Sequence, residues 1–101
     1  MPLSRRQFEL RVDEQGEEWM RQIYELLVRD RELAYSAQEL TESILGANVS
    51  VSDSEKFQRS LDALDGIQAV EKRWVDDLDY YAFFREFDTG TWERDYSDSR
   101  F

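Results

Sequence analysis

The sequence predicts one domain of the α+β class, with three helices, a C-terminal β-hairpin and a short strand between the first two helices. Apolar residues from Phe57 to Leu64 recur at helical spacing, and this run stops at Gly66. Two short segments of alternating apolar and polar residues follow, on either side of Asp76 and Asp77, as expected of strands joined by a tight turn. Two earlier segments have helical spacing, which gives the order helix, strand, helix, helix, hairpin.

The composition limits the chemistry that the chain can perform. Its 101 residues, 41% of them apolar, suffice for one domain with a small core. There is no cysteine and no histidine, which excludes disulfides, thiolate nucleophiles, histidine bases and Cys/His zinc sites. Because no run of about 18 apolar residues occurs, we expect a soluble, cytoplasmic protein without a membrane segment. We expect binding and no catalysis, with no cofactor and no metal.

The charge of the chain is strongly negative and unevenly distributed. Against 13 basic side chains stand 23 acidic ones, for a net charge of −10, which repels a phosphate backbone at long range. The first twelve residues carry Arg5, Arg6 and Arg11 against Glu9, a local charge of +2, so the remainder carries −12. The N-terminal arm is therefore the basic segment.

Three regions are expected along the chain. In residues 1–12, Phe8, Leu10 and Val12 alternate with polar residues, which predicts a short strand or an extended arm lying on the domain. Residues 13–87 form the domain itself. In residues 88–101, a C-terminal tail, aromatic residues are mixed with Asp and Ser, and they pack either against the body or against a partner.

The first helix is predicted over residues 14–30. Asp13 precedes it, and acidic residues fill its first turn, where the helix dipole favours them. Trp19, Ile23 and Leu27 fall on one face of this helix and are expected in the core.

The second helix has the best-defined start. Residues 33–35 favour a short strand, and Ser36 and Glu39 then have the spacing of a capping box. Gly46 is suited to a left-handed C-terminal cap. The next segment is longer than the turn of a compact helix-turn-helix, and Ser52 with Glu55 predicts a second capping box, for the third helix.

The hairpin strands are predicted over residues 69–75 and 78–87, and they carry a surplus of aromatic side chains. Alternation places Tyr80 and Phe84 on one face of the second strand and its other aromatic residues on the opposite face. Because large exposed apolar patches are uncommon on monomers, we expect one face to meet the arm, the tail or a second subunit, and we expect a homodimer. The candidate interface residues are Tyr81, Phe83, Phe87 and Trp92.

The segment from helix to hairpin resembles a known family. Its pattern is Leu61-x-x-Leu64-x-Gly66-x-x-x-Val70-Glu71-x-Arg73-x-Val75, followed by Tyr80-Tyr81-Ala82. This pattern resembles the helix-to-wing segment of winged-helix domains of prokaryotic transcriptional regulators, and residues 35–40 resemble the entry into their second helix. The resemblance covers residues 17–87.

The resemblance implies a small DNA-binding transcriptional regulator. In this family the outer face of the third helix reads DNA, and the hairpin, or wing, contacts the backbone or the minor groove. The candidate DNA-binding residues, to which the basic arm adds the first two, are Arg5, Arg6, Ser52, Ser54, Lys56, Gln58, Arg59, Lys72 and Arg73.

The acidic residues favour an alternative function. Four acidic side chains on the third helix outnumber Lys56 and Arg59 and leave it at −2, and Asp76, Asp77 and Asp79 cluster at the wing tip. Near phosphate, each of these carboxylates costs free energy. The alternative is an acidic protein-interaction module that engages a basic partner or imitates nucleic acid, with Lys56, Gln58 and Arg59 as a solvated face. The aspartates lack the spacing of a calcium loop, which favours an ordinary acidic turn.

Overall fold

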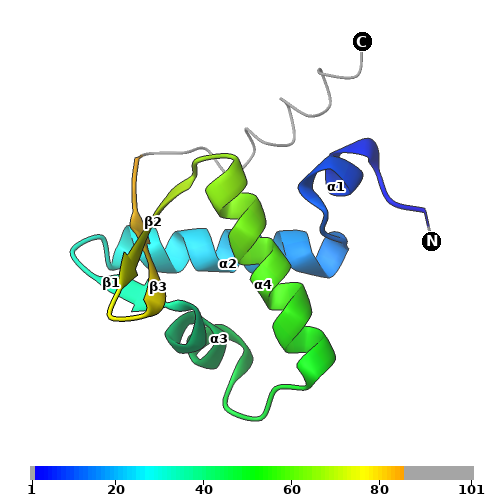
Figure 1. Ribbon diagram of the computed structural model, residues 1–101. Coiled ribbons are helices and arrows are strands. Elements are labelled where there is room, and N and C mark those ends of the chain that lie inside the picture. Colours follow the sequence, from blue (N-terminus) through cyan, green and yellow to red (C-terminus); the bar gives the residue numbers. More distant parts are fainter. Residues whose placement is uncertain (1, 86–101) are drawn as a thin grey trace.

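Four helices and a three-stranded antiparallel sheet make up residues 2–85, the part of the chain that the structure describes (Figure 1). The structure is a computed structural model. Its elements, in chain order, are α1 (Arg5–Leu10), α2 (Glu14–Arg29), β1 (Ala34–Ser36), α3 (Ala37–Leu45), α4 (Val51–Gly66), β2 (Val70–Val75) and β3 (Leu78–Phe83). The α+β class is as predicted, but the helices number four among these residues, and the prediction had three.

The extra helix, α1, lies where a strand or an extended arm was expected, so that prediction is wrong. Its start is fixed by a reciprocal capping box: the Gln7 N–H donates to the Ser4 hydroxyl at 3.1 Å, and the Ser4 N–H donates to the Gln7 side chain at 3.1 Å. Leu10 and Val12, 5% and 4% exposed, belong to the core. The segment that leads from α1 into α2 is therefore part of the folded body.

The core lies mainly between α2 and α4. Trp19, Ile23 and Leu27 are buried, as predicted. The rings of Trp19 and Phe57 meet edge to face, with centroids 5.7 Å apart, a contact that contributes about 0.5–1.5 kcal/mol beyond the area it buries.

A buried polar contact joins α2 and α4. The Ser60 hydroxyl, fully buried, donates to the carbonyl oxygen of Gly16 at 3.0 Å. A Cβ atom built on Gly16 would lie 2.8 Å from the Cβ of Val12 and 3.3 Å from the Ser60 hydroxyl oxygen. Position 16 therefore needs glycine because a side chain would not fit there.

Helix boundaries follow the local capping chemistry. The predicted box of Ser36 with Glu39 is present. Gly46 ends α3 as expected, but its φ of 98° and ψ of −179° differ from the left-handed helical conformation that was predicted for it. The box predicted at Ser52 is wrong, because Ser50 accepts the Asp53 N–H at 3.1 Å and α4 starts at Val51. Both serines suit an N-cap, and the extended backbone of Ser50 determines which one serves.

The hairpin forms as predicted around Asp76 and Asp77, whose φ angles of 50° and 66° are those that a two-residue hairpin turn of type I′ requires. The sheet order is β1-β3-β2, so β3 lies in the middle. The strand β3 ends at Phe83, earlier than predicted.

Tyr81 was expected at an interface, but that prediction is wrong. It lies at the centre of the sheet, paired with Tyr35 on one side and Lys72 on the other, and its side chain is fully buried. Alternation had separated the two faces of β3 without showing which one packs on the helices. Tyr81 therefore belongs to the core, and Phe83, on the same face, is half-buried.

Two glycines in helices provide a matched test of the close packing of Val12 and Ser60 around Gly16. Replacing Gly16 with Ala should lower the free energy of unfolding by about 1–2 kcal/mol, because overpacking outweighs the better helix propensity of alanine. Gly66→Ala is the control, since an added Cβ there meets nothing within 4 Å, and it should stabilise by about 0.5 kcal/mol. Urea denaturation measures both, and equal stabilities for the two variants would contradict the close approach.

Candidate binding surface

The start of α4 is the most exposed part of the helix expected to contact DNA. All five residues from Val51 to Glu55 are exposed, including the candidates Ser52 and Ser54. Burial begins with Phe57, where α4 meets the core. This end of α4 lies at the periphery of the molecule, far from the sheet (Figure 1). Its hydroxyl groups are therefore accessible to a partner.

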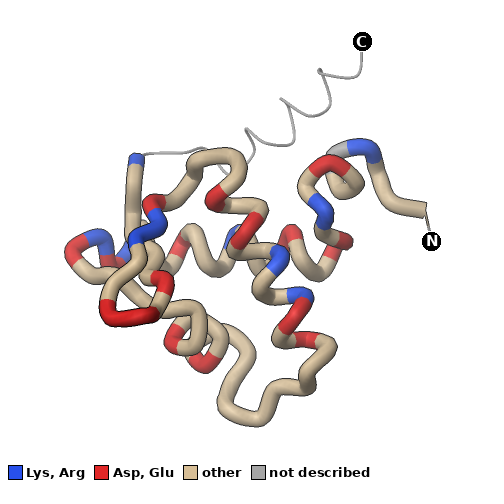
Figure 2. The backbone as a smooth tube through the Cα atoms, viewed as in Figure 1, with Lys and Arg blue, Asp and Glu red and all other residues tan. Residues whose placement is uncertain are grey.

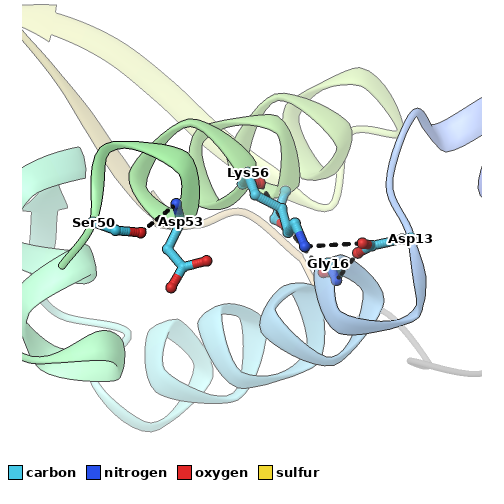
Figure 3. A network of polar contacts seen from close by, with 6 residues as sticks. Asp13, Gly16, Ser50, Asp53 and Lys56 are labelled. Carbon is cyan, nitrogen blue, oxygen red and sulfur yellow. Dashed lines mark hydrogen bonds and ion pairs between the residues drawn. The ribbon is translucent and has the colours of Figure 1, made fainter.

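The side-chain ammonium of Lys56 forms an ion pair within the protein. Its ammonium lies 3.0 Å from the carboxylate of Asp13, which also accepts the Gly16 N–H at 2.8 Å as the N-cap of α2 (Figure 3). Burial alone would raise the pKa of Asp13, but the hydrogen bonds from Gly16 and Lys56, with the charge of Lys56, outweigh it and hold that pKa below its ordinary value. The cation of Lys56 is thus matched by a carboxylate on the neighbouring helix.

Arg59, the other cation of α4, differs from Lys56. It is exposed, and it forms no ion pair with any residue between 2 and 85. Gln58, next to it, donates to the Asp62 carboxylate at 3.1 Å and to the Tyr81 hydroxyl at 3.4 Å, and so links α4 to the sheet. Burial raises the pKa of that Tyr81 hydroxyl. Gln58 therefore has a structural role besides any contact it makes outside the protein.

The cations of the wing are also paired. Lys72 lies 3.8 Å from the Asp79 carboxylate, and Arg73 donates to Glu71 at 3.0 Å. Beyond them the tip of the hairpin is acidic, and both Asp76 and Asp77 are exposed (Figure 2). The wing thus presents few free positive charges to a phosphate backbone.

Exposed apolar side chains also lie at the wing tip. Trp74 is 68% exposed, and Val75 and Leu78 are about half exposed. The aromatic content had indicated a contact surface on this hairpin, but within β2 and β3 the large apolar residues that are exposed are these three, and Phe84, just after β3, is half exposed, whereas Tyr81 is buried. The register explains the difference, because Val75 and Leu78 lie on the face of the sheet opposite Tyr81, whereas Trp74 shares the face of Tyr81 but lies next to the turn.

The arm adds cations on the other side of the molecule. Arg5 pairs with Glu9 at 2.9 Å and lies over the ring of Phe8, whereas Arg11 is exposed and unpaired among residues 2–85. For the candidate Arg6 only the backbone, in α1, is described, and Phe87 and Trp92 lie outside the described residues.

The structure brings the arm and α4 together and leaves the wing apart. Arg11, Lys56 and Arg59 line one groove, with a volume of about 840 Å³, between α1 and α4. Figure 2 shows the basic positions of the hairpin well away from those of α1 and α4. Sequence reasoning missed this groove because it missed α1, although the spacing of Ser4 and Gln7 is a helix-start signal that could have revealed it.

Comparisons with known proteins found no match, so the function of this surface is inferred from its own residues. No protein-family model matches the chain, and neither a curated protein nor a solved structure matches it. Within residues 2–85, no helix combines the length and apolar character needed to cross a membrane. The same residues hold no cluster of three carboxylates or other side chains suited to a metal ion.

Two substitutions separate the two roles of Asp13. Asp13→Ala removes both the cap and the ion pair and should cost about 1 kcal/mol or slightly more, whereas Asp13→Asn keeps a capping oxygen and should cost about 0.5 kcal/mol. Because the folded-state pKa of Asp13 is lowered, the benefit of its charge is present above the ordinary value of 3.8 and is lost as the pH falls through the folded value. Urea denaturation of wild type and Asp13→Asn should therefore converge at acid pH, and a constant difference would argue against the pair.

Proposed function

We propose that the protein is a small winged-helix DNA-binding protein of the transcriptional-regulator type, without catalytic activity, that acts in the cytoplasm. The order of its elements supports this proposal: α2, β1, α3 and α4 are followed by the β2–β3 hairpin. The sheet order β1-β3-β2 supports it as well, because it places the hairpin beside the short strand between the first two helices of the domain. In this arrangement α4 is the recognition helix and the hairpin is the wing.

The observation that carries the proposal is the exposed N-terminal part of α4. Recognition helices contact base edges through their N-terminal residues in the major groove. Here Ser52 and Ser54 offer hydroxyl groups that bond to bases or phosphates, and Arg59 offers an unpaired guanidinium on the same helix. The opposite face of α4 is anchored by Phe57, Leu61 and Leu64, so the exposed face is held in a fixed orientation.

The ion pairs that the cations form within the protein limit how strongly the protein binds DNA. Lys56, Lys72 and Arg73 each have a carboxylate partner within the protein, so each must exchange that partner for a phosphate. Only exposed, unpaired arginines such as Arg59 release counterions without such an exchange. We therefore expect a weak contribution from the phosphate backbone and a shallow dependence of affinity on salt.

Binding to a labelled random-sequence duplex, followed by fluorescence anisotropy in increasing salt, tests the proposal. We expect a slope of log affinity against log salt of about −2 to −3, corresponding to two or three neutralised phosphates. Arg59→Ala should weaken binding several-fold and make the slope shallower by about 1.

Arg29→Ala is the matched control for that variant. Arg29 is an exposed arginine at the far end of α2, paired with Asp30, so its removal changes the net charge equally without touching α4. Its affinity for the duplex should stay within about twofold of wild type, since distant exposed charges are largely screened. Absence of wild-type binding at about 50 mM salt would sink the DNA proposal.

A second candidate function is an acidic protein-interaction module, and the wing tip favours it. Asp76 and Asp77 are flanked by exposed Trp74, Val75 and Leu78, a combination of apolar surface and negative charge. Aromatic residues surrounded by charge are common at protein interfaces, and this tip complements a basic protein better than it does phosphate. A homodimer also stays a prediction, since residues 2–85 offer no observation that tests it.

The double variant Asp76→Asn, Asp77→Asn distinguishes the two candidates. Asparagine tolerates the positive φ angles of both positions, so the turn should be kept while two negative charges are removed. If the wing lies near a duplex, the affinity for DNA should rise about three- to fivefold at low salt. An unchanged DNA affinity, together with loss of binding to a lysine-rich peptide, would support the protein-interaction function instead.

A further inference from the structure

The groove between α1 and α4 has an apolar floor that the described residues leave uncovered. Its lining includes Leu3, Phe8, Val12, Ala63 and Ile67, from the N-terminal segment, α1, the α1–α2 linker, α4 and the turn that follows it. Leu3 and Phe8 are 50% and 62% exposed, so the groove offers two large apolar side chains to a ligand. The volume of about 840 Å³ is within the usual range for a bound ligand.

Two arginines in the lining are available to a ligand. Arg11 and Arg59 are exposed, and neither pairs with a carboxylate among residues 2–85. Other cations around the groove differ, since Lys56 is held by Asp13 and Arg5 by Glu9. Free guanidinium groups beside an apolar floor are suited to carboxylates, which they bind through two parallel hydrogen bonds.

The backbone at Arg11 is the second observation. Arg11 caps the C-terminus of α1 with φ 64° and ψ 33°, the left-handed conformation that glycine adopts at least cost. An arginine here is held by backbone hydrogen bonds from its N–H to the carbonyls of Gln7 and Phe8. The chain thus carries a long cationic side chain at a position where the backbone geometry favours glycine.

We propose that this groove binds an acidic peptide segment of a protein partner. A large apolar side chain of the segment lies on Leu3 and Phe8, and two carboxylates of the segment pair with Arg11 and Arg59. Glu9 and Asp13, which also line the groove, are already paired with Arg5 and Lys56. A nucleic acid fits less well, because its phosphates would leave the exposed apolar side chains of Leu3 and Phe8 uncovered. This inference goes beyond the proposed DNA contact and does not depend on it, since Arg11 lies outside α4.

The test uses the full-length chain and a fluorescein-labelled synthetic peptide with a tryptophan flanked by glutamates. Fluorescence anisotropy should show saturable binding, in the micromolar range expected of a short peptide. Arg59→Ala should weaken it about tenfold, and Arg29→Ala, which removes a paired arginine far from the groove, should leave it unchanged.

Arg11→Gly is the decisive variant. It removes the guanidinium and relieves the left-handed backbone, so thermal unfolding should occur at the same or a higher temperature while peptide affinity falls about tenfold. A loss of binding in this variant therefore cannot come from a loss of folding. Neither Ser52→Ala nor Ser54→Ala, on the exposed start of α4, should affect the peptide, although both should weaken a DNA contact.

Several results would overturn the proposal. These are no saturable binding by the wild type, equal affinity for a peptide with alanine in place of tryptophan, and Arg11→Gly binding as tightly as wild type. If instead the chain is dimeric by sedimentation and Arg11→Gly is monomeric, the groove is occupied by a second copy, and the partner proposal is wrong. If the protein fails to bind DNA, each of these peptide and sedimentation results keeps its meaning.

Discussion

The close approach of α2 and α4 is the constraint on which the rest of the structure depends. At Gly16 there is room for one hydrogen atom in place of a side chain, and the buried Ser60 hydroxyl uses this space to reach the Gly16 carbonyl. Val12 fills the remaining space and so brings the α1–α2 linker into the core. With the helices fixed in this way, the buried face of α4 is determined, and so is the face that it presents to a partner.

Local signals in the sequence predicted much of the fold. The capping box at Ser36 and the turn at Asp76 and Asp77 are short-range features, and both were found where expected. The helix α1 was not predicted because three alternating apolar residues also fit a strand, although Ser4 and Gln7 have the spacing of a capping box. Ser60 could not be recognised as a core residue, because its importance comes from a glycine on another helix.

The candidate site was predictable only in part, because charge pairing is a property of three dimensions. In sequence, Lys56 and Arg59 are equivalent cations on one helix face. In the structure, Asp13 neutralises Lys56 across the helix interface and leaves Arg59 free. The two proposed functions therefore rest on different observations: the DNA proposal on the order of the elements, and the protein-interaction proposal on the paired cations and the acidic hairpin tip. A chain with a net charge of −10 can still expose a few free arginines where a ligand needs them.

The three-residue linker between α1 and α2 connects groove and core more directly than either helix does. Arg11 lines the groove, Val12 packs beneath Gly16, and Asp13 caps α2 and holds Lys56. If a ligand in the groove restrains Arg11, it also restrains the adjacent Val12 and Asp13, which contact α2 and α4. By reciprocity, a ligand that stabilises the α2–α4 contact binds more weakly when that contact is loosened, and the coupling free energy is the same in both directions. In this protein, ligand binding and folding stability would then be thermodynamically coupled.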